Sequence, residues 1–131
     1  MLKVVLIPKK GRGVVATQPI KKGTLIEAAP TCSFPTQQRE LIDQTELSIF
    51  YFVKPSEYNQ ENKNVAGHIV FGLASFTNHS KTPNAKIEWR EDECGLWTHL
   101  IALEDIQVND EVTIFYTNID AYILAGNFVE N

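Results

Sequence analysis

The sequence predicts a mostly β fold with one short helix, and three observations lead to this expectation. Short runs of β-branched and aromatic residues recur along the chain, and Gly, Pro, Asn and Asp separate them at short intervals. One segment, Ala85–Arg90, alternates strictly between apolar and polar residues, as a half-buried strand does. The chain has 131 residues, of which 44% are hydrophobic and 21% charged. This is enough for one globular domain with its own core, spanning 1–131.

In the N-terminal half, strands and turns are expected to follow each other closely. The expected strands are Leu2–Ile7, Val14–Ala16, Thr24–Ala28 and Ser48–Val53, with turns at Lys9–Gly13 and Pro19–Gly23. A short helix is expected to start at Pro35 and end near Asp43, because proline's missing N–H costs nothing in the first helical turn. The polar segment Lys54–Asn64 is expected to be a loop, either a solvated surface loop or one that faces a substrate.

The C-terminal half predicts a hairpin and a final strand. Ala85–Arg90 and Leu96–Leu103 are expected to pair through a four-residue loop at Asp92–Gly95. After a polar turn at 105–110, Glu111–Tyr116 is expected to be the last strand. Its period of two places Val112, Ile114 and Tyr116 on one face. Tyr116 then belongs to the buried side and needs a partner for its hydroxyl group.

The charge balance favours some partners over others. Twelve Lys and Arg face sixteen Asp and Glu, for a formal net charge of −4. This argues against a nucleic-acid binder, which usually carries a basic face. An acidic chain is compatible with a basic partner, such as a lysine-rich peptide, but does not require one.

The sequence also bounds compartment and metal content. The longest apolar runs are too short to span a bilayer, and the N-terminus lacks the features of a secretory signal peptide. We therefore expect a cytoplasmic or nuclear protein, with delivery into a host cell as an option. Cys32 and Cys94 form no CxxC motif, and two buried free thiols are preferred over a single disulfide. The sequence has no cluster of Cys and His residues, so no metal site is predicted.

Three short segments carry residues suited to chemistry, and each also has a purely structural interpretation. The glycines of Lys10–Gly13 let the backbone approach a ligand, or simply make a tight hairpin turn. Asn78–Asn84 gathers several hydrogen-bonding side chains, which also suit a polar turn. Glu111–Tyr116 ends in a tyrosine, which a core strand with an edge aromatic would also explain.

The combination of these segments, in this order, is more specific than any one of them. The phrase GRGVVATQPIKKG is followed by GLASFTNHS with PN close behind, then by ALEDI and finally by EVTIFY. In this order the chain resembles the SET domain of protein lysine methyltransferases, from Lys10 to about Asn118. It is most similar to the short, stand-alone SET proteins that lack cysteine-rich flanking segments.

The resemblance implies a β-clip-like SET fold, in which small sheets surround a knot-like crossing of the C-terminal segment. It also implies S-adenosylmethionine as cofactor and a protein lysine as methyl acceptor, on a histone-like, ribosomal or other basic segment. No nucleic acid or membrane partner is expected. By position, the residues implied to bind the cofactor are Lys10, Gly11, Arg12, Gly13, Asn78 and His79. Tyr116 is implied to be catalytic, and it would line the lysine channel with Tyr51 and Ile114.

The expected chemistry suits these residue types. Methyl transfer from a cationic sulfur to an amine needs alignment and a neutral amine more than it needs a strong base. A free lysine has a pKa near 10.4, so only about one molecule in a thousand is neutral near pH 7.4. A narrow aromatic channel disfavours the ammonium form and lowers the pKa. Aromatic faces also favour the sulfonium cation.

The sequence departs from the family pattern near its end. Ile114 stands where an aromatic residue is usual, and Phe115 where an Asp is usual. No cysteine-rich segment follows Tyr116, so residues 118–131 are expected to serve as a substitute lid or as a dimer contact. Two alternatives to the enzyme stay open, and these departures favour the first of them. One is an inactive SET-fold module that binds a peptide or the cofactor, and the other is a structural, homodimeric β domain.

Overall fold

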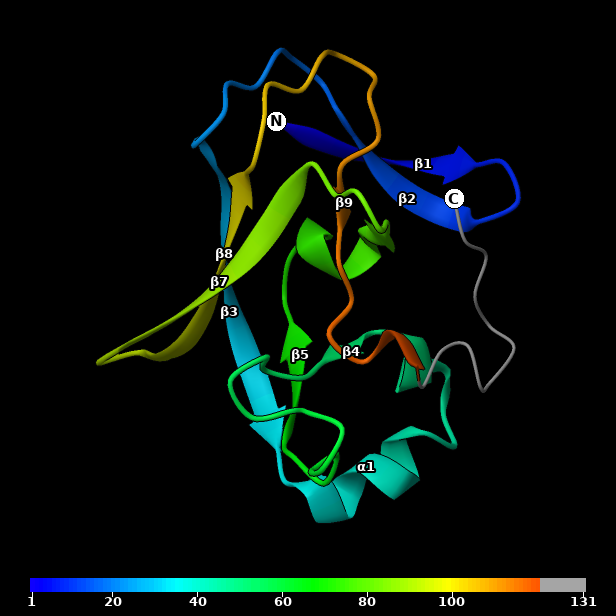
Figure 1. Cartoon of the computed structure of the whole chain (residues 1–131), viewed down its shortest axis with the longest axis vertical. Helices are drawn as coiled ribbons and strands as arrows, with labels where there is room; N and C mark the ends of the chain where they lie inside the picture. The colour runs from blue at the N-terminus through cyan, green and yellow to red at the C-terminus, as the bar shows by residue number, and fades with distance from the viewer. Residues whose placement is uncertain (121–131) are drawn as a thin grey trace.

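The computed structural model of the chain describes residues 1–120, which fold into three small sheets and a few short helices (Figure 1). The strands are β1 (Leu2–Ile7), β2 (Gly11–Ala16), β3 (Leu25–Phe34), β4 (Tyr51–Phe52), β5 (Gly67–Val70), β6 (Asn78–His79), β7 (Ala85–Asp92), β8 (Gly95–Ala102) and β9 (Thr113–Ile114). The helices are α1 (Thr36–Ile42) and two 3-10 turns, η1 (Glu46–Ile49) and η2 (Leu73–Phe76). The prediction of a mostly β fold with a short helix is confirmed.

The strands form three separate sheets. β1 and β2 form an antiparallel hairpin, and five strands form the largest sheet in the order β4-β5-β3-β8-β7. The third sheet consists of two short parallel strands, β6 and β9. Figure 1 shows the segment of β9 running through the middle of the molecule, between the large sheet and the β1–β2 hairpin. This pairing places the segment after η2 beside the last strand, as the family resemblance implies.

The main core joins residues from distant parts of the chain. Val14, Leu100, Ile106 and Val112 are almost completely buried in one cluster. A second, smaller cluster lies under the loop that follows β4. Its buried members are Phe34, Tyr51, Val53, Tyr58 and Val65. The hairpin, the large sheet and the last strand thus share one core, whereas the loop after β4 has its own.

Most predicted elements are found, with shifted ends. β1 has the predicted bounds. α1 begins at Thr36, so Pro35 is its N-cap and not, as predicted, its first helical residue. β3 is longer than the predicted strand Thr24–Ala28 and continues to Phe34. The extension exists because β3 pairs with β8 along its first half and with β5 along its second. Neither β5 nor η2 was predicted.

The predicted strand Ser48–Val53 is wrong in its first half. Residues 46–49 form the 3-10 turn η1, and only Tyr51 and Phe52 are in a strand. The reason is local, because the Thr45 hydroxyl accepts a hydrogen bond from the Leu47 N–H at 3.2 Å and starts a helical turn. β-branched and aromatic residues favour strands only where a cap does not offer the backbone another partner.

Two C-terminal predictions also need correction. Asp92 pairs with Gly95, so the β7–β8 hairpin has a two-residue turn instead of a four-residue loop. The last strand is shorter than Glu111–Tyr116, since only Thr113 and Ile114 pair in β9. Val112 and Ile114 are buried and Phe115 is exposed, but Thr113 is buried as well, so burial does not alternate along the segment as predicted.

Three further observations complete the description. Cys32 and Cys94 are free, but both are exposed, so the prediction of buried thiols is wrong. Among residues 1–120, the helices are all too short and too polar to cross a lipid bilayer. The expected lid or dimer contact at 118–131 falls mostly on residues outside the described part, and Asn118 itself is buried.

Candidate active site

The parallel pair β6–β9 is the frame of the site. Asn78 lies opposite Thr113, and His79 lies opposite Ile114. The Ser80 N–H continues the ladder and donates to the Ile114 carbonyl at 2.9 Å. Residues more than thirty positions apart are therefore held side by side by backbone hydrogen bonds. The NHS phrase and the final tyrosine motif meet here.

Glu111 ties this frame to the glycine turn. Its carboxylate accepts hydrogen bonds from Lys10 Nζ at 2.9 Å and from Asn78 Nδ2 at 2.8 Å. The Lys10 side chain is 8% exposed, so this ion pair is shielded from water. Asn78 Nδ2 also lies 3.2 Å from the Arg12 carbonyl oxygen. The three segments that the sequence singled out thus converge on one carboxylate, which sequence reasoning did not assign to the site.

Position 13 must be a glycine, because Asn78 and Glu111 pack closely against its backbone. A Cβ atom at position 13 would lie 2.7 Å from Asn78 Nδ2 and 3.0 Å from Glu111 Oε2. Gly11 differs, because a Cβ atom there would meet nothing within 4 Å, while its φ of +81° favours glycine. One glycine serves close packing and the other serves the turn.

Asn84 braces the last strand from the other side. Its Nδ2 donates to the Glu111 carbonyl at 2.8 Å, and its Oδ1 accepts from the Thr113 N–H at 2.9 Å. One side chain therefore satisfies two backbone groups that flank Val112, which is fully buried. Asn84 was quoted as part of the motif, but a positioning role was not predicted for it.

Glu27 on β3 fixes the approach to the site. Its carboxylate accepts from the Leu73 and Ala74 N–H groups at 2.9 and 3.0 Å, and so caps η2. A side chain at Gly72 would collide with this carboxylate, since a Cβ atom would lie 2.5 Å from Glu27 Oε1. The cap positions the turn that leads into Thr77, Asn78 and His79.

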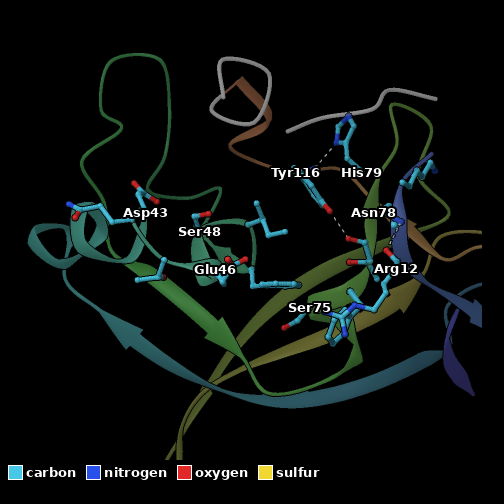
Figure 2. A pocket seen from close by; sticks show the side chains of 16 residues that line it. Arg12, Asp43, Glu46, Ser48, Ser75, Asn78, His79 and Tyr116 are labelled. Atoms are coloured by element: carbon cyan, nitrogen blue, oxygen red, sulfur yellow. Dashed lines mark hydrogen bonds between the residues drawn. The ribbon is translucent and has the colours of Figure 1, made fainter. Parts of the chain in front are cut away.

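Tyr116 is held at both its backbone and its hydroxyl group. Its N–H donates to His79 Nδ1 at 2.9 Å, and its hydroxyl donates to the Thr77 carbonyl at 2.6 Å (Figure 2). Burial, and to a lesser extent the charge of Glu111, raises the pKa of Tyr116 well above its usual range. The phenol is therefore neutral and its oxygen can accept a hydrogen bond from an amine.

His79 acts as an acceptor within the site. It is 4% exposed, and burial, followed by the nearby Lys81 and Lys10, lowers its pKa. The neutral ring accepts the Tyr116 N–H at Nδ1, which places its proton on Nε2. Its ring also packs against Phe115 and Tyr116, with centroids 4.8 and 5.4 Å apart. His79 thus orients the Tyr116 backbone.

A first cavity of about 620 Å³ opens beside these residues (Figure 2). Of the residues predicted to bind the cofactor, five line it: Lys10, Gly11, Arg12, Asn78 and His79. Gly13 does not line it, because its role is to let Asn78 pack beneath the turn. Across the cavity lie Asp43, Glu46 and Ser48, which come from the end of α1 and from η1. The lining is largely polar and carries both signs of charge.

A second cavity of about 510 Å³ is lined by all three residues predicted for the lysine channel, namely Tyr51, Ile114 and Tyr116. Its walls are mostly aromatic and aliphatic. The Tyr51 hydroxyl is already engaged, because it donates to Asp43 Oδ1 at 2.9 Å and lies 3.4 Å from Arg39 Nε. Burial is the largest reason that the pKa of Tyr51 is raised. Tyr51 therefore presents a neutral ring wall.

The two cavities meet at Tyr116. Four residues line both of them, and these are Ile49, Ser75, Thr77 and Tyr116. Sequence reasoning identified Tyr116 only. The other three come from 3-10 turns and their ends, which the sequence pattern did not predict, although Ser75 and Thr77 stand inside the phrase that carried the resemblance. A polar cavity and an aromatic cavity joined at one tyrosine can bring two different molecules into contact.

Comparisons with known proteins agree with this geometry. The SET domain family model matches residues 11–117. A histone-lysine N-methyltransferase of Schizosaccharomyces pombe, specific for H3 lysine-37, is 32% identical over 108 residues, which cover 82% of this chain and 67% of that protein.

Two solved structures are also similar. A protein of Plasmodium falciparum assigned as a histone methyltransferase aligns with a TM-score of 0.66 at 25% identity, covering 88% of this chain and 91% of the other. The Neurospora SET domain protein DIM-5, a histone lysine methyltransferase, aligns with a TM-score of 0.65 at 20% identity. That alignment covers 88% of this chain and about half of the other, 51%, and it supports the fold alone.

The chain belongs to the SET domain family. Within that family it is a protein-lysine N-methyltransferase, as predicted from the sequence.

Proposed function

We propose that this chain transfers a methyl group from S-adenosylmethionine to the side-chain amine of a protein lysine, with the cofactor in the first cavity and the lysine in the second. The observation that carries the proposal is the junction at Tyr116. Both cavities reach this residue, and its hydroxyl group is neutral and fixed by the Thr77 carbonyl at 2.6 Å. Direct transfer between two bound molecules requires such a shared point.

The residues of the first cavity fit S-adenosylmethionine. This molecule combines an amino-acid end, which carries a carboxylate and an ammonium group, with a hydroxyl-bearing nucleoside. The cavity offers cations at Lys10 and Arg12, carboxylates at Asp43 and Glu46, and the amide of Asn78. Its volume of about 620 Å³ is that of an ordinary small-molecule site. Arg12 is suited to the carboxylate of the ligand, and the Asn78 Oδ1 and the acidic pair to its ammonium and hydroxyl groups.

The chain's own residues prepare the acceptor lysine. When bound, S-adenosylmethionine supplies a methyl group attached to a positively charged sulfur. The aromatic wall of the second cavity disfavours an ammonium ion and so lowers the pKa of an entering lysine. Oxygen atoms at Thr77 and Tyr116 can hold the neutral amine by hydrogen bonds. Attack of the nitrogen lone pair on the methyl carbon would break the carbon–sulfur bond and release the neutral thioether S-adenosylhomocysteine, and the charge left on the methylated amine would face the rings of Tyr51 and Tyr116.

The acceptor is proposed to be a lysine in an accessible protein segment. The related protein of Schizosaccharomyces pombe acts on histone H3, as its name states. Histone H3 is therefore the first protein to test here, together with other lysine-containing proteins. The net charge of −4 is compatible with such a basic partner.

The test separates cofactor binding from transfer. Titration calorimetry with S-adenosylhomocysteine, the product form of the cofactor, should give saturable binding that Asn78→Ala weakens. Tyr116→Phe should retain this binding and lower methyl transfer to a protein substrate by about 10²-fold or more, because it loses the hydroxyl group at the junction. Full activity of Tyr116→Phe would refute the role of the hydroxyl, and absence of binding would refute the assignment of the first cavity.

A further inference from the structure

The second cavity extends beyond the predicted lysine channel to a pair of aromatic rings. Phe52 on β4 and Trp89 on β7 line it and meet edge to face, with centroids 6.4 Å apart and ring planes at 71°. β4 and β7 are the two edge strands of the five-stranded sheet. The sheet is curved enough for its opposite edges to touch through these rings. Both rings are partly exposed.

Trp89 is held in place from behind. The ring of His68, which is 4% exposed, lies 5.1 Å from the Trp89 ring. His68 is itself opposite Phe52 in the pairing of β4 with β5, so it supports both members of the aromatic pair. Burial lowers the pKa of His68, and the supporting ring is neutral at pH 7. The aromatic pair is therefore a preformed apolar surface supported by a neutral ring.

The described lining of the second cavity contains no carboxylate. Of the described residues that line it, Lys86 is the one with a charged side chain. Lys86 Nζ lies 3.0 Å from Glu88, and Arg90 lies 2.7 Å from the same carboxylate. The three side chains stand on the face of β7 opposite Trp89, and together they carry a net charge of +1. A second basic residue next to the acceptor lysine would lose hydration against this mostly apolar lining and would find no acidic partner in its described part.

We propose that Phe52 and Trp89 form a subsite for a large apolar side chain close to the acceptor lysine, and that its apolar lining disfavours a basic residue in that position. The inference rests on the proposed function, since the subsite is continuous with the cavity that ends at Tyr116. It commits to a substrate segment in which the target lysine has an apolar neighbour, and not to a segment of consecutive basic residues.

The experiment uses three sets of peptides with one lysine each. One set carries Leu, one Glu and one Arg. In each set, that residue is placed in turn at each of the two positions before and the two positions after the lysine. At one position, kcat/KM for methyl transfer should be about tenfold higher with Leu than with Arg. Trp89→Leu should reduce this ratio to within about twofold.

A matched variant controls for loss of structure. Trp97 stands on β8, where its Nε1 donates to Asp92, and it lines neither cavity. Trp97→Leu should keep the preference for Leu. If it lost the preference as Trp89→Leu does, or if no position distinguished Leu from Arg, the subsite would be refuted.

A binding measurement keeps this result separate from the proposed function. The chain has two Trp residues, so Trp97→Phe leaves Trp89 as its one indole fluorophore. In the presence of S-adenosylhomocysteine, the Leu peptide should shift this fluorescence at concentrations about tenfold lower than the Arg peptide. Equal transfer to all peptides would refute the subsite and leave the methyltransferase intact. Selective binding without transfer would support the subsite and refute the proposed reaction.

Discussion

Glu111 shows how the residues of this site depend on one another. Its carboxylate receives Lys10 from the glycine turn and Asn78 from β6, while its backbone carbonyl receives Asn84. The motifs point to the residues around this carboxylate, because glycines, Asn and His in a fixed order are uncommon. They do not point to Glu111 itself, since an acidic residue at the start of a strand is ordinary. A carboxylate that links three distant segments can be recognised only after the fold has brought those segments together.

The two glycines of the turn allow a paired prediction. Gly13→Ala should displace Asn78, since its Cβ atom would lie 2.7 Å from Asn78 Nδ2, and should lower the free energy of unfolding by about 1–3 kcal/mol. It should also weaken S-adenosylhomocysteine binding in calorimetry. Gly11→Ala has open space and costs only the strain of its positive φ, about 1–2 kcal/mol. Equal losses of cofactor binding in both variants would contradict the proposed packing role of Gly13.

The buried histidines predict how stability depends on pH. Burial lowers the pKa values of His68 and His79 in the folded state. The unfolded chain therefore binds protons more readily once the pH falls below about 6.5, and unfolding becomes easier. Each histidine can contribute at most about 1.4 kcal/mol per pH unit in that range. Denaturant unfolding of His79→Gln between pH 7.5 and 5 should show a shallower decline than the unchanged protein, and an equal decline would contradict this account.

At the scale of elements, local composition predicted several strands correctly. The prediction failed where a hydrogen-bonding cap determines the local structure. β1, β7 and β8 were found because their pairing agrees with their local pattern. η1 replaced a predicted strand because Thr45 caps it, and η2 was missed because its cap, Glu27, lies 46 positions away from Leu73. A short turn stabilised by a distant side chain leaves no periodic signal in its own sequence.

The cap on η2 gives a prediction at this scale. Glu27→Gln keeps the shape of the side chain and removes the charge that receives the Leu73 and Ala74 N–H groups. The free energy of unfolding should fall by about 1–2 kcal/mol, measured by denaturant titration. Glu91→Gln is a matched control, because Glu91 is exposed on the β7–β8 hairpin and should change stability by less than about 0.5 kcal/mol. Equal effects in the two variants would show that the cap contributes nothing.

At the scale of the whole molecule, the site is assembled from most of the chain. Lys10, Ile49, Thr77 and Tyr116 lie on four different segments, yet they surround two joined cavities. The sequence order of the motifs made the family recognisable, and with it the fold. The junction was beyond sequence reasoning, because which side chains share a cavity depends on the parallel pairing of β6 with β9 and on the curvature of the large sheet.

The loop after β4 and the C-terminal segment give the last prediction. Asp120 accepts the Tyr58 hydroxyl at 2.9 Å and pairs with Lys63, so it ties the end of the described chain to that loop. Tyr58 also lines the second cavity, and burial, followed by Asp120, raises its pKa to about 12. Asp120→Asn should therefore loosen one wall of the peptide cavity and leave the first cavity intact. Because Lys63 and Asp120 are partly exposed, we expect KM for a peptide to rise only about two- to fivefold, with unchanged S-adenosylhomocysteine affinity. A Tyr58→Phe variant should show the same pattern, and a loss of cofactor affinity in either variant would mean that the tie supports the whole site.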